Sequence, residues 1–256
     1  MKPNRIFPIL LALLFTLPAL SQKADQTNGW IFYTGNHKLT EKWGIHTDVQ
    51  IRRSEFFKEW QQLQLRAGLE YYFSKSMSVT AGYSFINTWP YGQFAEEVNP
   101  KFNHYEFAEH RIWQQFQTKQ QFGRLYTQNR FRLEQRWTEH KVISGEEYVR
   151  DEFQYKNRVR YRYMIQIPLT HKEMEDNTLF FQWSDEVFVN FGKGVKSNLL
   201  DQNRMYFALG WRFNPHFNIQ LGYMNQFIQK SDGVHKENNH TAQVSITYNL
   251  DFTKKN

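Results

Sequence analysis

The feature that most constrains this chain is an alternation of side-chain character with a period of two residues. It is clearest in RLYTQNRFRLEQRWTE, residues 124–139. One set of alternate positions is largely apolar: Leu125, Phe131, Leu133 and Trp137, broken by Thr127 and Asn129. The other set is ionic or amide-bearing: Gln128, Arg130, Arg132, Glu134 and Arg136. Successive side chains of a β-strand point to opposite sides, so the segment predicts a strand with one apolar and one charged face.

The same alternation recurs along the whole chain and predicts eleven strands. The runs cover about 30–34, 43–52, 63–73, 79–85, 109–116, 125–137, 153–167, 179–190, 202–213, 217–227 and 241–252. In the first run the bulky positions are Trp30 and Phe32, followed by Thr34. The fifth run, EHRIWQQF, gives no clear phase. Most runs are about 9–13 residues long, which suits membrane-crossing strands of about 9–11 residues better than the 5–6 typical of soluble domains.

The connections between the runs alternate in length. LTEK, SKS and NPH are short, whereas NTWPYGQFAEEVNPKFN, TEHKVISGEEYVR, GKGVKSNLLD and KSDGVHKENN are long and polar. Short turns at one end and long loops at the other are typical of an outer-membrane barrel. One connection, PLTHKEMEDN, is long where a short turn is expected.

Alternation alone also fits a lipocalin-like barrel or a sandwich, which would bury the apolar face. The apolar faces end in aromatic residues, as lipid-facing girdles do: Trp43, Tyr71, Trp137, Trp183 and Trp211. They carry almost no charge apart from Asp185. A sheet in lipid must close, because an open edge has no hydrogen-bond partners. We therefore predict an all-β fold, a transmembrane antiparallel up-and-down β-barrel, and the even strand count of such barrels favours about 12 strands, with 10 as the alternative.

The N-terminus has the organisation of a secretory signal peptide. Lys2 and Arg5 precede an apolar stretch, and Ala19-Leu20-Ser21 resembles a cleavage site. We assign residues 1–21 to a cleaved signal, 22–28 to a short extension, 29–252 to the barrel and 253–256 to a C-terminal tail. The formal charge is +7, and without Lys2 and Arg5 the remaining 30 basic and 25 acidic residues give +5. The chain has no cysteine and no basic run of the kind that binds nucleic acid, so neither disulfides nor a nucleic-acid partner is expected.

Residues 202–227, QNRMYFALGWRFNPHFNIQLGYMNQF, together with EHRIWQQF upstream and the near-terminal Phe252, resemble a family of uncharacterised bacterial outer-membrane β-barrels, a domain of unknown function. The resemblance covers residues 28–252. It implies a barrel integral to the outer membrane, contact with outer-membrane lipids, and insertion by the barrel-insertion machinery through an aromatic end signal at Phe252. Thr253 to Asn256 follow that signal and depart from the usual pattern. The resemblance implies no catalytic residues.

No catalytic or metal-binding pattern is evident in the sequence. Outer-membrane phospholipases place a Ser two residues after the catalytic His, and none of the nine His has a Ser there. YTQN, residues 126–129, resembles that family, but Arg130 and Phe131 replace the Gly and His that should follow. No two Asp are adjacent, as an aspartate-based outer-membrane protease would require. His235, Glu237 and His240 lie close in sequence and are interpreted as part of a solvated loop. We expect no enzyme, no metal and no cofactor.

The strongest cluster is the set of basic residues on the polar faces, which form a lumen basic row. Its members are Arg130, Arg132, Arg136, Lys156, Arg158, Arg160, Arg162, Arg204 and Arg212. The possible acidic partners are Asp48, Glu70, Glu109, Glu134, Glu152, Glu186 and Asp251. The row predicts either a ladder of ion pairs that fills a narrow barrel or a path for anions, since rings of Arg and Lys favour anions in pores.

These observations predict a monomeric, non-enzymatic outer-membrane protein, either structural or a narrow, anion-leaning channel with an ion-paired lumen. A wide aqueous channel belongs to barrels of about 16 strands and is not expected. One alternative is an envelope lipid-modifying enzyme with its site in the loops. Another is a scaffold subunit that contacts partners through its extracellular loops, with residues 87–103 as the outward surface.

Overall fold

The computed structural model describes residues 22–93, 106–144 and 147–253. In these residues the chain forms eleven β-strands: β1 (Gln22–Lys38), β2 (Trp43–Ser54), β3 (Glu59–Ser74), β4 (Met77–Thr88), β5 (Phe107–Phe122), β6 (Leu125–Ser144), β7 (Glu147–Pro168), β8 (Thr178–Phe191), β9 (Leu200–Arg212), β10 (Phe217–Gln229) and β11 (His235–Tyr248). No helix in this part of the chain is both long and apolar enough to cross a membrane. The predicted signal peptide, most of the predicted contact loop 87–103 and residues 254–256 lie outside the described residues.

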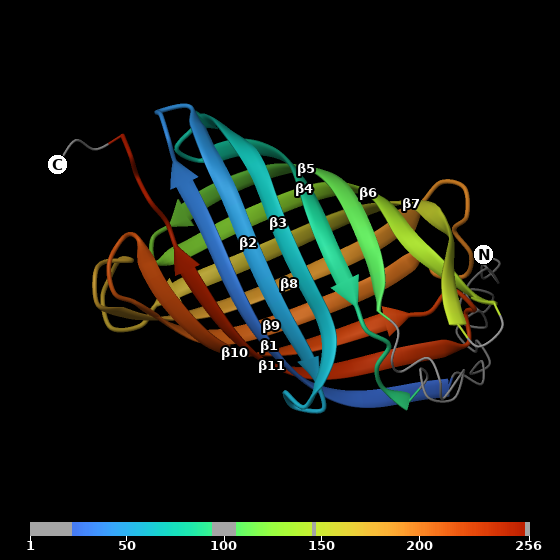
Figure 1. Cartoon of the computed structure of the whole chain (residues 1–256). Helices are drawn as coiled ribbons and strands as arrows, with labels where there is room; N and C mark the ends of the chain where they lie inside the picture. The colour runs from blue at the N-terminus through green and yellow to red at the C-terminus, as the bar shows by residue number, and fades with distance from the viewer. Residues whose placement is uncertain (1–21, 94–105, 145–146, 254–256) are drawn as a thin grey trace, which may run out of the picture.

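The strands close into one barrel (Figure 1). Each strand pairs antiparallel with the next along the chain, and the barrel closes where β1 pairs with β11 in parallel, from Gln22 beside His235 to Thr34 beside Thr247. The predicted all-β barrel is therefore confirmed, with eleven described strands rather than twelve. A closed sheet of antiparallel pairs alone needs an even number of strands, and the single parallel seam removes that requirement. The closure is mixed rather than wholly antiparallel.

The two ends of the barrel differ in their connections. At the short-turn end, residues 39–42, 75–76, 123–124, 169–177 and 213–216 join successive strands. At the long-loop end, residues 55–58, 89–106, 192–199 and 230–234 join successive strands. At this end β6 and β7 extend as one long hairpin (Figure 1). That hairpin takes up most of TEHKVISGEEYVR, which the sequence analysis assigned to a loop. Because the strands number eleven, β1 starts at the long-loop end and β11 finishes at the short-turn end.

Residues 22–28, assigned from the sequence to an extension ahead of the barrel, form the first part of β1. They pair with β11 from Gln22 beside His235 to Asn28 beside Thr241. Alternation does not reveal this part of the strand, because residues 22–28 are mostly polar and the inward positions at this end of the barrel are polar as well. Ala24 and Asn28 are almost fully buried, and so are Glu237 and Thr241, which lie opposite them on β11.

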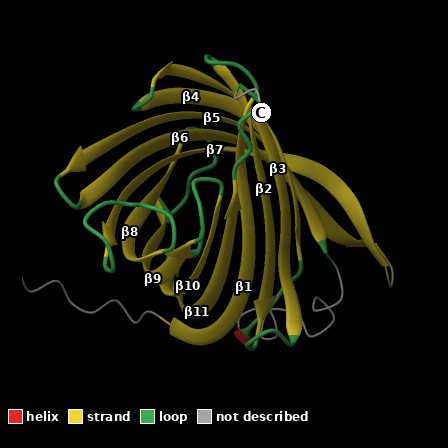
Figure 2. Ribbon diagram, turned by 90° about the vertical axis from the view of Figure 1, so that its left-hand side faces the viewer, coloured by secondary structure: helices red, strands yellow, loops and turns green. Residues whose placement is uncertain are grey.

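The polar faces of the strands point into the lumen, and the apolar faces point outward. Asp48, Arg66 and Glu134 are each less than a tenth exposed, whereas Leu65 and Phe131, from alternate positions of the same strands, are 43% and 50% exposed. The order of the strands around the barrel is visible in Figure 2. This inverted arrangement is that of a transmembrane barrel and excludes the lipocalin-like and sandwich alternatives, which would bury the apolar side.

The first strand departs from the general expectation that bulky apolar residues face outward. Trp30 is fully buried in the lumen in a cluster with Tyr206 and Met224, and Phe32 packs against that cluster. Ile31 faces outward in their place, at 40% exposure. Alternation does not give the orientation of this strand, because both of its faces carry apolar side chains.

The fifth strand, whose sequence gave no clear phase, has an aromatic residue among the inward polar ones and a mixture of apolar and polar residues, including Ile112, Gln114 and Phe116, on the outside. Trp113 is 1% exposed in the lumen between Arg111 and Gln115. Its ring lies against the glycine backbones of two neighbouring strands. A Cβ atom at Gly68 would be 2.9 Å from the ring, and one at Gly82 would be 2.5 Å from it. These two glycines leave the space that lets an indole lie flat against the inner wall.

Candidate functional site

A continuous ion-pair network crosses the lumen from β5 to β9. Its centre is Glu134, which accepts from Arg158 Nη2 at 2.6 Å and from Arg160 Nη1 at 2.7 Å. The exposed fraction of the Glu134 side chain is only 2%. A carboxylate in that position is stable only with paired, hydrogen-bonded cations around it. Glu134 therefore holds β6 and β7 together from the inside.

The network extends from this centre in both directions. Toward the long-loop end, Glu109 receives the Arg136 guanidinium at 2.6 Å and also pairs with Arg111, and Arg158 reaches Asp201 of β9 at 2.7 Å. Toward the short-turn end, Glu186 of β8 accepts from Arg160 at 2.8 Å and from Arg130 at 2.6 Å. The connected members are Glu109, Arg111, Arg130, Glu134, Arg136, Arg158, Arg160, Glu186 and Asp201.

Five inward arginines form no ion pair with any carboxylate in the described residues: Arg52, Arg132, Arg162, Arg204 and Arg212. Arg132 donates to the Gln115 amide oxygen at 2.6 and 3.1 Å. Arg162 donates to Gln128, and Arg52 donates to Gln50 at 2.6 Å. Neutral amides do not compensate a buried charge as a carboxylate does. The lumen therefore holds more positive charge than its own acids neutralise.

Aromatic rings and arginines together fill the middle of the lumen, forming what we term the aromatic–arginine layer. It is built on three buried rings: Trp30, Phe188 and Trp113. The Arg204 guanidinium lies between the first two rings, 5.5 Å from Trp30 and 4.7 Å from Phe188. The nearest of the other stacked arginines are Arg52 over Trp30 at 4.2 Å, Arg160 over Phe188 at 4.4 Å and Arg132 over Trp113 at 4.6 Å. Cation–π contacts of this kind stabilise desolvated guanidinium groups.

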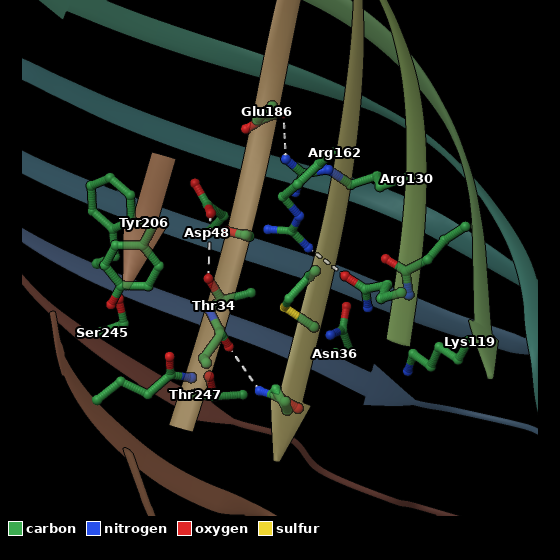
Figure 3. Close-up of a pocket in the computed structure, with 18 of the residues that line it drawn as sticks. Thr34, Asn36, Asp48, Lys119, Arg130, Arg162, Glu186, Tyr206, Ser245 and Thr247 are labelled. Carbon is green, nitrogen blue, oxygen red and sulfur yellow. Dashed lines mark hydrogen bonds and ion pairs between the residues drawn. The ribbon is translucent and has the colours of Figure 1, made fainter. Parts of the chain in front are cut away.

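A cavity of about 660 Å³, which we term the basic chamber, lies between this layer and the short-turn end. It extends to the β3–β4 turn, where Lys75 lines it, and toward the end of β5, where Lys119 lines it. Eight basic side chains face it, against two acidic ones, Asp48 and Glu186. The basic residues are Arg66, Lys75, Lys119, Arg130, Arg132, Arg160, Arg162 and Arg204. In Figure 3, Arg130 and Arg162 lie on one wall, with Thr34, Tyr206 and Ser245 on another. The chamber is a strongly basic compartment with hydroxyls and amides on its other walls.

The structure brings together most, but not all, of the residues predicted for the lumen. Lys156 and Arg212 are half-buried on the inner wall but form no ion pair with a described carboxylate and do not line the chamber. Glu70 is buried near the short-turn end and accepts from the Tyr72 hydroxyl at 3.1 Å, apart from the network. Glu152 is exposed on the extended β6–β7 hairpin and takes no part in the lumen. Asp251 lies beyond β11, beside Lys38.

Five charged lumen residues were absent from the sequence-based site: Arg52, Arg66, Arg111, Asp201 and Glu237. Glu237, interpreted from the sequence as part of a solvated loop, is 1% exposed on β11. Arg52 and Arg66 lie on polar faces of clearly alternating runs, so the alternation itself could have identified them. Arg66 pairs with Asp48 at 3.7 Å. Arg111 belongs to the run without a clear phase. Asp201 comes directly before the ninth run, in residues interpreted as a loop.

The histidines and glutamate considered for a metal site do not converge. His235 Nδ1 contacts Asp232 at 2.6 Å, Glu237 pairs with Lys230, and the Tyr223 hydroxyl contacts His240 at 2.6 Å. The hydrogen bond from the backbone of His235 is the main cause that lowers the pKa of Asp232 to about 2, so this carboxylate serves as a local cap of the β10–β11 loop. Among the described residues no group of three potential ligands could hold a metal ion.

The fold and the polar lumen define a porin-like β-barrel. The chain is similar to a solved structure of the NanC porin in a rhombohedral crystal form, with a TM-score of 0.50 and 9% identity, over 87% of this chain and 98% of that chain. The chain belongs to the family described as "Protein of unknown function (DUF2490)", whose model matches residues 27–238. No curated protein sequence matches it. The resemblance to an uncharacterised barrel family is thereby confirmed.

Proposed function

We propose that this protein is an outer-membrane β-barrel that acts as a narrow, anion-preferring channel, with the basic chamber as its charged compartment. The observation that carries the proposal is the imbalance of charge in the chamber, eight basic side chains against two acidic ones. Filling and stiffening a barrel would be achieved best by matched ion pairs, as around Glu134. An excess of arginines attracts anions and raises their local concentration.

The chamber also has the polar lining that a hydrated anion needs. Besides the arginines, amide and hydroxyl side chains line it from both halves of the barrel, including Thr34, Asn36, Gln182, Ser245 and Thr247. Such groups replace part of the water around an ion that enters a narrow space. The aromatic–arginine layer then forms the constriction that an ion must pass, which supports a small conductance rather than that of a wide pore.

The test is the conductance of the refolded barrel in a planar bilayer with a potassium chloride gradient, which reports ion preference through the reversal potential. We expect small, anion-selective openings. Arg162→Glu should reduce or reverse the anion preference, because it places a carboxylate in the chamber without breaking an existing ion pair. Lys172→Glu is the matched control, since it makes the same change of charge in an exposed turn. Cation selectivity, or equal effects of the two variants, would contradict the proposal.

A closed structural barrel is the second candidate, and the aromatic–arginine layer favours it. Trp30 and Phe188 are fully buried and Trp113 is 1% exposed, so these side chains fill the middle of the lumen. The same bilayer experiment separates the candidates. A barrel that is folded, as shown by heat-modifiable gel mobility, and yet electrically silent would overturn the channel and leave the arginines a structural filling.

A further inference from the structure

The inner wall between β6 and β7 holds four arginines in a square of like charges. Arg130 is directly opposite Arg162 in the sheet, and Arg132 is directly opposite Arg160. All four line the basic chamber. Like charges placed directly across two strands destabilise a sheet. This arrangement therefore requires compensation by negative charge, from within the barrel or from a ligand.

The barrel's own carboxylates compensate only half of the square. Glu186 accepts from Arg130 at 2.6 Å and from Arg160 at 2.8 Å, and Arg160 is also held by Glu134. The two arginines on the other diagonal, Arg132 and Arg162, reach only the amide oxygens of glutamines. Within the square, the uncompensated charge is thus confined to this pair.

Three guanidinium donors in the square are buried without a hydrogen-bond partner among the described residues. They are Arg130 Nε, Arg132 Nη1 and Arg162 Nε. Arg132 as a whole is 2% exposed, so bulk water does not solvate it. A buried charged donor without a partner costs free energy, and such groups in native proteins call for a specific explanation. An anion bound in the chamber would supply the missing acceptors.

We propose that Arg130, Arg132 and Arg162 form a binding site for the phosphate group of a small molecule. Arginine forks match phosphate geometry, and a phosphate offers three acceptor oxygens to the three available donors, whereas a carboxylate offers two. A dianion also offsets more of the excess positive charge. This inference rests on the basic chamber of the proposed channel and gives it a ligand class, but binding itself does not require conduction.

The rest of the chamber fits a ligand larger than the phosphate alone. A volume of about 660 Å³ leaves room beside the arginine square, and the wall across from it carries hydroxyl and amide groups, among them Thr34, Asn36 and Ser245 (Figure 3). The aromatic–arginine layer narrows the side toward the long loops, while Lys75 and Lys119 line the chamber near the short-turn end. The ligand therefore enters from the short-turn end, past two further cations.

The test is isothermal titration calorimetry on the refolded barrel in a zwitterionic detergent, at constant ionic strength, with inorganic phosphate, methyl phosphate and acetate as probes. We expect saturable binding of both phosphates and much weaker binding of acetate. Arg132→Gln and Arg162→Gln should each weaken phosphate binding roughly tenfold or more, the loss expected when one charge-assisted partner is removed. Arg212→Gln, at an inner-wall arginine outside the chamber, should leave the affinity unchanged.

The alternative outcomes are distinct. Absence of saturable phosphate binding to a barrel with folded gel mobility, or equal affinity in all variants, would overturn the site. Acetate binding as tightly as phosphate would overturn the ligand class. A barrel that binds phosphate but does not conduct ions would support this site and overturn only the channel. A barrel that conducts anions but does not bind phosphate would support the channel and overturn only this site. Arg162→Gln removes a like-charge contact, so this variant is expected to fold.

Discussion

Arg130 of β6 lies directly across the sheet from Arg162 of β7, and both side chains point into the lumen. Only one of the two is compensated, because Glu186 accepts from Arg130 at 2.6 Å while Arg162 reaches an amide. The charge of Arg130 is therefore partly offset within the barrel, whereas that of Arg162 is not. In the proposed phosphate site, Arg162 would contribute mainly to ligand binding, and Arg130 would contribute to both stability and binding.

The first prediction sets Glu186→Gln against Arg162→Gln. Glu186→Gln leaves two buried guanidinium groups short of a carboxylate and should lower the free energy of unfolding by about 3 kcal/mol. Arg162→Gln should raise it slightly, by up to about 1 kcal/mol, because it relieves a cross-strand repulsion without breaking an ion pair. Urea unfolding of the barrel in lipid vesicles, followed by tryptophan fluorescence, measures both changes. A marked loss of stability in Arg162→Gln would show that its charge is structurally required.

The second prediction concerns Glu134, the centre of the ion-pair network. Glu134→Gln removes the acceptor shared by Arg158 and Arg160 and should destabilise the barrel by about 3 kcal/mol or more, because the side chain and both partners are buried. Glu173→Gln, in an exposed turn, is the control and should have almost no effect. Unfolding in urea would be compared for the two variants. Equal stability would mean that the network contributes little beyond filling space.

The sequence predicts the barrel and the polar faces well where one face is largely apolar. In β2, β3, β6 and β7 the inward row carries charged residues and the outward row is mostly apolar, so alternation alone gives the correct phase. It fails for β1, where Trp30 faces inward and Ile31 outward. Period-two reasoning assumes that apolar side chains face lipid, and it has no means of recognising an aromatic ring that serves to stack on arginine.

The partners of the lumen charges were less predictable than the charges themselves. Arg132 and Arg160 lie in similar sequence surroundings. Each has charged residues two positions away on its own strand: an arginine and a glutamate for Arg132, and two arginines for Arg160. Only the register between β6, β7 and β8 decides that Glu134 and Glu186 both contact Arg160 and neither contacts Arg132. The parallel seam between β1 and β11 joins residues more than 200 positions apart and leaves no local signal.

The third prediction concerns Gly82, one of the two glycines whose backbone lies against the Trp113 ring. Gly82→Ala should destabilise the barrel by about 1–3 kcal/mol, because its Cβ would lie 2.5 Å from the Trp113 ring and also meet the Ala67 carbonyl oxygen. Ala81→Val adds more volume on the outward face of the same strand and should be nearly neutral. Urea unfolding and the tryptophan emission spectrum report the effect. An unchanged stability in Gly82→Ala would show that the indole can move away at little cost.

The fourth prediction concerns Trp30, which belongs to the aromatic–arginine layer together with its stacked arginines. Trp30→Ala removes a fully buried ring that contacts Arg52 and Arg204, so it should cost about 3–5 kcal/mol and widen the constriction. We expect a larger single-channel conductance than in the wild type, measured in planar bilayers. Ile31→Ala, one residue along on the outward face, is the control and should leave conductance unchanged. If a folded Trp30→Ala barrel conducts no better than the wild type, the constriction lies elsewhere in the lumen.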